Sequence, residues 1–257
     1  MEEIVLNGWL PDPPKPEDWK FRDIKPRLRK LAKTGDHMIQ VFTPVSHQGQ
    51  LHSCAANVTA DALEILMGLG GTVVQLSRLF IYFNARNYHG AIDKDKGTYL
   101  RMAFESLKRL GVCPESMWDY VEANVFLRPP LAAYKEANAN KVMGFYRIAS
   151  RDEERLDDIE TAIRANHPVA FGTQVGTEFS NYKGETEYIF RLPEVFEGRH
   201  AMLWCGVRKR NGRREFWTRN SWGSGWGLGG YAWMDQSYVT SSETRDIWVP
   251  TRMPRLI

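Results

Sequence analysis

Cys54 lies where a loop is expected to become a helix, at the end of the stretch HQGQLHSC that begins at His47. The thiolate, rather than the thiol, is the nucleophile in cysteine chemistry, and the unpaired N–H groups and dipole of a helix N-terminus favour the thiolate. Cys54 is therefore placed to be reactive. Most lone cysteines are buried packing groups, so this placement has weight only if a base and a residue that orients the base are also present.

Candidates for the base and its orienting group occur in the second half of the chain. His200 opens the apolar run AMLWCGV and is expected at the start of a strand, where a rigid backbone can hold an imidazole in place. Asn220 follows the predicted strand FWTR and begins the stretch NSWGSGWG. Its side-chain amide can accept a hydrogen bond from an imidazole N–H, and the Trp222 indole can cover that bond from water. Taken singly, the two segments also fit a surface histidine at a strand end and a glycine-rich turn with aromatic packing.

Together these segments resemble the papain-like cysteine peptidases. The matching motifs stand in the order of that family and are Gln48-Gly49, Ser53-Cys54, His200-Ala201, Asn220-Ser221-Trp222-Gly223, Trp226-Gly227 and Gly230-Tyr231. The separation of Cys54 and His200 falls within the broad range of the family. Likeness to a bacterial-type branch extends over most of residues 40 to 250 and includes Gln50-Leu51, Ala56-Asn57, Leu79-Phe80-Ile81-Tyr82, Gly97-Thr98-Tyr99 and Gly111-Val112-Cys113-Pro114-Glu115.

The resemblance implies a role for each matching residue. Cys54 would be the nucleophile, His200 the general base and acid, and Asn220 the residue that orients His200. The side-chain amide of Gln48 would donate to the oxyanion together with the Cys54 main-chain N–H. Trp222 would shield the contact between His200 and Asn220.

The sequence departs from the family pattern next to the nucleophile. In the larger branch a cysteine three residues before the nucleophile forms a disulfide, and here that position is Leu51; the usual tryptophan after the nucleophile is Ala55. A glycine usual two residues before the nucleophile is replaced by His52. We expect His52 to narrow the subsite for the residue before the scissile bond, so that small residues are preferred, and to favour the Cys54 thiolate when protonated. A solvent-facing His52 without a role is the alternative.

The resemblance also implies that the main chain of Gly97 contacts an extended peptide substrate.

The elements that must position these residues fall into two halves. Helical spacing of apolar residues predicts helices over 55–67, 77–86, 99–110 and 156–166. Short apolar runs predict strands over 168–175 and 201–207, and the turn pair Asn211-Gly212 joins the latter to a strand over 215–218. The resemblance implies an α+β papain-like fold for the catalytic domain, 41–257. Its helical half, about 41–140, would pack against a β-barrel-like half, about 141–257, with the active-site cleft between them.

Residues 1 to about 40 differ from the rest of the chain. They contain the proline-rich stretch PDPPKPEDW and a basic amphipathic stretch from Ile24 to Leu31, and they look like a surface-running arm. N-terminal segments often block the site in this family, so we expect a prosegment-like arm that lies over or near the cleft and inhibits the protein. A passive strap along the surface is the alternative.

Composition excludes several other classes. The chain has 257 residues, 43% hydrophobic and 25% charged, which suits a globular protein. A formal charge of +3, without basic runs interleaved with aromatic residues, indicates no nucleic-acid partner. The sequence has neither a bilayer-spanning apolar run nor a signal peptide at its start. Three cysteines, Cys54, Cys113 and Cys205, do not form a disulfide framework, which indicates a reducing compartment. We expect a protein without membrane contact that is cytoplasmic, or exported without a cleaved signal.

These observations predict a cysteine peptidase that hydrolyses protein or peptide substrates through an acyl-enzyme and needs no cofactor. His47, His89 and His167 lack the spacing of metal ligands, so no metal site is expected. An acyltransferase or deamidase that uses the same acyl-enzyme is the nearest alternative, because the triad does not dictate whether water or an amine resolves the intermediate. A catalytically silent binding module on the same scaffold is the other.

Overall fold

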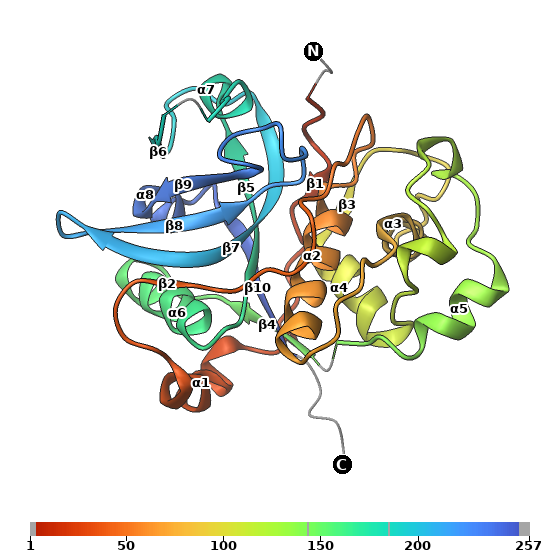
Figure 1. Cartoon of the computed structure of the whole chain (residues 1–257), viewed down its shortest axis with the longest axis horizontal. Coiled ribbons are helices and arrows are strands. Elements are labelled where there is room, and N and C mark those ends of the chain that lie inside the picture. Colours follow the sequence, from red (N-terminus) through yellow and green to blue (C-terminus); the bar gives the residue numbers. More distant parts are fainter. Residues whose placement is uncertain (1–3, 143, 185, 252–257) are drawn as a thin grey trace.

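The computed structural model describes residues 4–142, 144–184 and 186–251, and Figure 1 shows their arrangement. Helices α3, α4 and α5 lie on one side of the molecule, the large sheet with α1, α6, α7 and α8 lies on the other, and α2 lies between them (Figure 1). In chain order the elements are β1 (Trp9–Leu10), η1 (Phe21–Asp23), α1 (Lys25–Leu31), β2 (His37–Met38), α2 (Cys54–Leu69), α3 (Arg78–Asn87), β3 (Thr98–Tyr99), α4 (Leu100–Arg109), η2 (Glu115–Met117), η3 (Glu122–Asn124), α5 (Leu131–Ala137), β4 (Gly144–Ile148), α6 (Asp152–Arg164), β5 (Val169–Val175), α7 (Thr177–Ser180), β6 (Ile189–Phe190), β7 (Gly198–Arg210), β8 (Arg213–Arg219), β9 (Tyr231–Asp235), α8 (Gln236–Thr240) and β10 (Arg245–Thr251).

Helix α2 is the central element of the fold. Every residue from Cys54 to Gly68 is buried, which agrees with the scarcity of charge in this segment. The helix contacts α3 and α4 in the helical half and β7 in the sheet. Near its end, Gly68 lies so close to the Phe42 ring that an added Cβ would be 2.2 Å from Cδ2. The predicted central helix is therefore present, and it carries Cys54 at its first turn.

Eight of the ten strands in the described residues form one sheet in the order β4-β10-β5-β7-β8-β9-β6, with β2 also paired to β7, and β1 and β3 form a separate two-stranded sheet. The β half is thus better described as a sheet than as a barrel. Asn211 and Gly212, with φ of 49° and 77°, make the predicted turn between β7 and β8. Leu203 lies opposite Arg219 in this antiparallel pair, so the end of β8 returns to the start of β7. This register brings the residue after Arg219 close to His200.

A buried ion pair ties the sheet to the central helix. Arg219 Nε of β8 donates to Asp61 Oδ2 of α2 at 2.9 Å, and both side chains are almost fully buried. Arg219 Nη1 also donates to the Tyr231 hydroxyl on β9 at 2.7 Å. The pair fixes the end of β8 against the helix that carries Cys54.

Most residues of the N-terminal arm are exposed or half-buried, and a few buried side chains anchor the arm on the body. Trp9 and Phe21 are each 1% exposed. β1 pairs in parallel with β3 of the helical half, and β2 pairs with β7 of the sheet. The Trp9 ring occupies the space that a side chain at Gly172 would need. Burial of these large apolar side chains holds the arm against both halves.

Candidate active site

Cys54 begins α2 and is completely buried. Burial raises the pKa of the Cys54 thiol to about 12, although main-chain N–H groups, including those of Ala201 and Ala55, donate to the sulfur and oppose this change. The helix N-terminus alone predicted a reactive thiolate. In this structure loss of solvent outweighs that effect, so the thiol is protonated.

His200 lies near the start of β7, and Asn220 directly follows β8. Asn220 Oδ1 is 2.7 Å from His200 Nε2 and also accepts the Ser221 N–H at 2.7 Å, which identifies Oδ1 as the acceptor and places the proton on Nε2. His200 Nδ1 is buried and has no hydrogen-bond partner within the described residues. The Trp222 ring stacks on the imidazole with centroids 4.4 Å apart and planes 22° apart. Burial lowers the pKa of His200 to about 4, so the ring is neutral.

Gln48 lies in the loop before Cys54 and is bound to the loop that begins at Asn220. Its Oε1 accepts the Ser221 hydroxyl at 2.8 Å, and its main-chain N–H donates to the Ser221 carbonyl at 2.8 Å. Its side-chain Nε2 donates to the Leu51 carbonyl at 3.0 Å and to the Val5 carbonyl at 3.3 Å. The amide expected to bind an oxyanion therefore binds a carbonyl of the N-terminal arm in this structure.

The arm runs directly past the sulfur of Cys54. A Cβ added to Gly8 would lie 2.9 Å from that sulfur. The Asn7 N–H donates to the Arg199 carbonyl at 2.6 Å, and the Thr98 N–H donates to the Gly8 carbonyl at 3.1 Å. Gly97, with φ of 84°, faces Gly8 so closely that an added Cβ would be 2.5 Å from the Gly8 oxygen. The main-chain contact expected near Gly97 is thus made by the arm itself.

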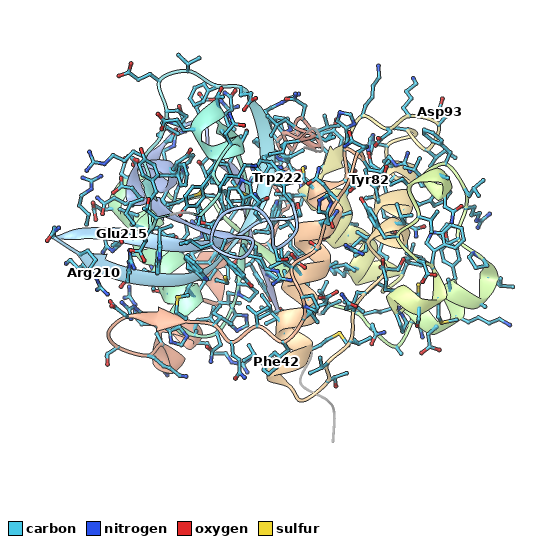
Figure 2. All side chains as sticks on the ribbon, turned by 45° about the horizontal axis from the view of Figure 1, so that its top comes forward. Phe42, Tyr82, Asp93, Arg210, Glu215 and Trp222 are labelled. Carbon is cyan, nitrogen blue, oxygen red and sulfur yellow. The ribbon has the colours of Figure 1, made fainter. Side chains whose placement is uncertain are left out.

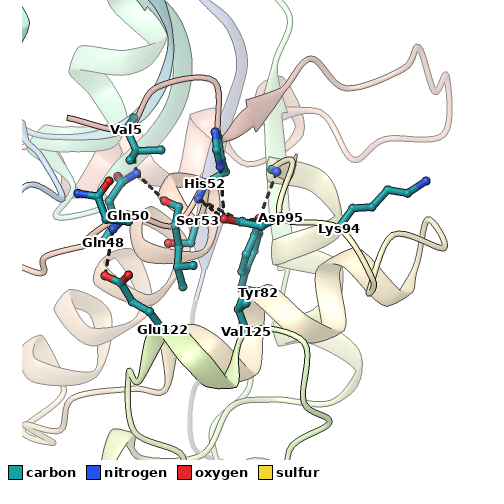
Figure 3. Close-up of polar contacts among 12 residues, drawn as sticks. Val5, Gln48, Gln50, His52, Ser53, Tyr82, Lys94, Asp95, Glu122 and Val125 are labelled. Atoms are coloured by element: carbon teal, nitrogen blue, oxygen red, sulfur yellow. Dashed lines mark hydrogen bonds and ion pairs between the residues drawn. The ribbon is translucent and has the colours of Figure 1, made fainter. Parts of the chain in front are cut away.

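His52 turns toward Asp95 and is neither free in solvent nor folded across the cleft (Figure 3). The hydrogen bond to Asp95 raises the pKa of His52, so the ring loses its charge at a higher pH than an ordinary histidine. Burial alone would raise the pKa of Asp95, but hydrogen bonds from His52 and Tyr82 lower it. Asp95 lies in the charged loop IDKDKG, where no pattern distinguished it from its neighbours.

Other candidate residues stay outside the site. Cys113 and Cys205 are buried and free, as is Cys54. Within residues 4–142, 144–184 and 186–251, no group of three histidine, cysteine or carboxylate side chains could hold a metal ion. Across the same described residues, no helix combines the length and the hydrophobicity that crossing a bilayer requires.

The fold and this site define a papain-type cysteine protease. The pattern of the papain family of cysteine proteases matches residues 32–247, so the chain belongs to that family and is a cysteine-type peptidase. It is 34% identical over 233 residues, or 86% of its length, to an uncharacterised peptidase C1-like protein of Acanthamoeba polyphaga mimivirus, 72% of which is covered. The crystal structure of xylellain, a cysteine protease from Xylella fastidiosa, superposes with a TM-score of 0.84 at 26% identity over 96% of both chains.

Another relative is longer than this chain. Mouse pro-cathepsin H is 29% identical over 202 residues, which is 74% of this chain and 56% of the relative. The chain therefore spans little more than half the length of this curated protein. The predicted papain-like α+β fold is confirmed by the structural match to xylellain, which extends through the N-terminal arm as well as the catalytic body.

Proposed function

We propose that the protein hydrolyses peptide bonds through a covalent acyl-enzyme on Cys54, with His200 as base and acid and Asn220 as the residue that orients His200. The observation that carries this proposal is the state of His200. Its Nε2–H is bound to Asn220, its plane is held by Trp222, and its Nδ1 is left unpartnered within the described residues. A neutral imidazole with one free lone pair can accept the proton of a nearby thiol.

The chemistry follows from these positions. His200 takes the thiol proton as Cys54 attacks the peptide carbonyl, and the developing oxyanion is bound by the Gln48 amide and the Cys54 main-chain N–H. The protonated imidazole then gives its proton to the leaving amine, which leaves an acyl group on sulfur. Water activated by His200 releases that group and regenerates the thiol. Asn220 keeps the ring in the tautomer that both transfers need.

A peptide-library digest analysed by mass spectrometry tests this function. Cleavage should be abolished in Cys54→Ala and unchanged in the matched variant Cys113→Ala, because Cys113 lies outside the site. Gln48→Ala should lower kcat by about 10²–10³, as expected for loss of one oxyanion donor. Persistent cleavage by Cys54→Ala would overturn the proposal. An amine acceptor added to the same digest distinguishes hydrolysis from acyl transfer by the mass of the product.

We further propose that the N-terminal arm inhibits the site. Three contacts support this. The Val5 carbonyl accepts a hydrogen bond from the Gln48 side-chain amide, and Gly8 lies against the Cys54 sulfur. The Thr98 N–H donates to the Gly8 carbonyl. The arm also removes water from Cys54 and His200, which are both 0% exposed. A peptide substrate needs the same amide and the same main-chain edge, so the arm and substrate compete.

Replacement of Gly8 tests the inhibitory role of the arm. A Cβ at Gly8 would lie 2.7 Å from the His52 carbonyl and 2.9 Å from the Cys54 sulfur, so Gly8→Ala should displace the arm from the cleft. We expect kcat/KM for a peptide to rise about tenfold or more, which corresponds to about 1.4 kcal/mol of lost competition. Gly225→Ala is the matched control, because nothing lies within 4 Å of its added Cβ. Equal activity of wild type and Gly8→Ala would show that the arm does not block turnover.

A further inference from the structure

Asp95 is the centre of a hydrogen-bond network that joins two loops beside Cys54 (Figure 3). Its carboxylate accepts the main-chain N–H of His52 at 3.2 Å and 3.3 Å, and the His52 ring Nδ1 lies 3.3 Å from Oδ2. It also accepts the Tyr82 hydroxyl at 2.5 Å, and the Tyr82 oxygen accepts the Gly97 N–H at 3.1 Å. One carboxylate therefore links the residue two positions before Cys54 to Gly97.

The two ends of this network form the edges of a gap that holds peptide main chain. A Cβ added to Gly8 would lie 2.7 Å from both carbonyl atoms of His52, and one added to Gly97 would lie 2.5 Å from the Gly8 oxygen. Gly8 thus passes between His52 and Gly97 while its carbonyl accepts the Thr98 N–H. The spacing of these edges decides whether an extended chain fits beside the nucleophile.

Asp95 connects its own loop, residues 92–97, to His52 in the loop before Cys54. Arg86, stacked on the Tyr82 ring at 4.1 Å, donates to the Lys94 carbonyl at 2.9 Å and holds the base of the loop. Asp93 and Lys94 are exposed, and Figure 2 shows Asp93 at the outer edge of the molecule. All three cysteines are free, so no disulfide fixes the spacing of the edges. That spacing depends on hydrogen bonds to a charged carboxylate, which are stronger than bonds between neutral groups.

We propose that Asp95 is a positioning residue for peptide hydrolysis, which sets the distance between the His52 and Gly97 edges and hence the fit of the substrate main chain. This inference rests on the proposed peptidase function. Asp95 acts through His52 on one side and through Tyr82 on the other, and it does not contact the reacting atoms. The edges bind main chain in the ground state and the transition state alike, so loosening them weakens binding more than chemistry.

Two reagents that alkylate Cys54 separate binding in the gap from reactivity of the thiol. A peptidyl epoxide must lie between the edges, whereas iodoacetamide needs only access to the sulfur. The arm covers Cys54 against both reagents, so the ratio of the two second-order rate constants is insensitive to how far the arm is open. We expect Asp95→Ala to lower this ratio about tenfold or more. The same variant should raise KM for an extended peptide with a much smaller change in kcat.

Matched variants make the result decisive. Asp93→Ala, in the same loop and exposed, should leave the ratio at its wild-type value. Asp95→Asn keeps an acceptor oxygen and should fall between wild type and Asp95→Ala. Tyr82→Phe removes only the link to Gly97 and should lower the ratio less; it decides the matter if Asp95→Ala does not fold. An unchanged ratio in folded Asp95→Ala, or in Tyr82→Phe in that case, overturns the role of Asp95. Failure of both reagents to label Cys54 selectively in Gly8→Ala, in which the arm is displaced, would instead count against the proposed function.

Discussion

At the scale of single residues, the protonation state of Cys54 depends on whether the N-terminal arm excludes water from it. Burial raises the pKa of its thiol to about 12 and lowers the pKa of His200 to about 4, so both groups are neutral beneath the arm. When water reaches the cleft, this penalty on the charged forms is reduced, and the thiol pKa should fall while the imidazole pKa rises. The same two side chains therefore fit a resting state under the arm and a reactive state without it.

His52 allows a prediction about which side chains the protein accepts immediately before the scissile bond. His52→Gly removes the imidazole, whose Nδ1 lies 3.3 Å from Asp95 Oδ2, but keeps the main-chain N–H that donates to Asp95. We expect this variant to accept larger residues immediately before the scissile bond, as read from a peptide-library digest. Asp95 raises the pKa of His52 above its ordinary 6.5, so the charged ring is present below 6.5 and is lost as pH rises through the raised value.

The charge of His52 also predicts a pH effect for His52→Gly. In the wild type the ring is charged across the acid limb of the pH–rate profile, where it favours the Cys54 thiolate, so the substitution should shift the acid limb to higher pH and leave the alkaline side unchanged. An identical cleavage profile in wild type and variant, with the same pH dependence, would assign His52 to the loop alone.

At the scale of elements, the pair of Asp61 on α2 and Arg219 on β8 holds the helix that begins at Cys54 against the strand that leads to Asn220. Asp61→Ala leaves a buried guanidinium without its counter-charge, so we expect the free energy of unfolding to fall by about 3–5 kcal/mol. Urea unfolding measures this loss. Asp36→Ala is the control, because its pair with Arg210 at 2.7 Å is about half exposed and should contribute little to stability. A similar small loss in both variants would contradict the prediction.

At the scale of the whole molecule, a pair of buried carboxyl groups couples the arm to the body. The Asp12 N–H donates to Asp246 Oδ2 at 2.6 Å, and Asp12 itself accepts the Trp248 indole N–H at 2.9 Å and the Arg101 N–H at 3.2 Å. Arg147 Nη2 donates to Asp246 Oδ1 at 3.1 Å. Burial and the adjacent Asp246 raise the pKa of Asp12 to about 7, against an ordinary value of 3.8. The folded chain therefore favours protonated Asp12.

This pair makes stability depend on pH. The contribution of protonated Asp12 is fully present below pH 3.8 and is lost as pH rises through about 7. Asp12→Asn cannot ionise and keeps the main-chain N–H that donates to Asp246, so the variant should gain stability over wild type as pH rises, by about 1 kcal/mol or more above neutrality. Urea unfolding of both proteins across this range measures the difference. A difference that does not change with pH would show that Asp12 does not titrate in the folded chain.

The residues of the proposed catalytic site could be named from the sequence itself. Cys54, His200 and Asn220 each stand at a boundary between a loop and a regular element, within motifs that resemble those of the papain family. Helical spacing likewise predicted α2, and Asn211-Gly212 predicted the turn between β7 and β8, because those features depend on neighbouring residues.

Only the tertiary structure decided what surrounds that constellation. Gly8 and Val5 are separated from Cys54 and Gln48 by more than forty positions, so their contact depends on the path of the whole arm. Asp95 is one of several charged residues in its loop, and only the folded structure shows that it binds His52 and Tyr82. Burial of the thiol reversed the pKa expected from the helix N-terminus, because desolvation is a property of the assembled fold and not of the local motif.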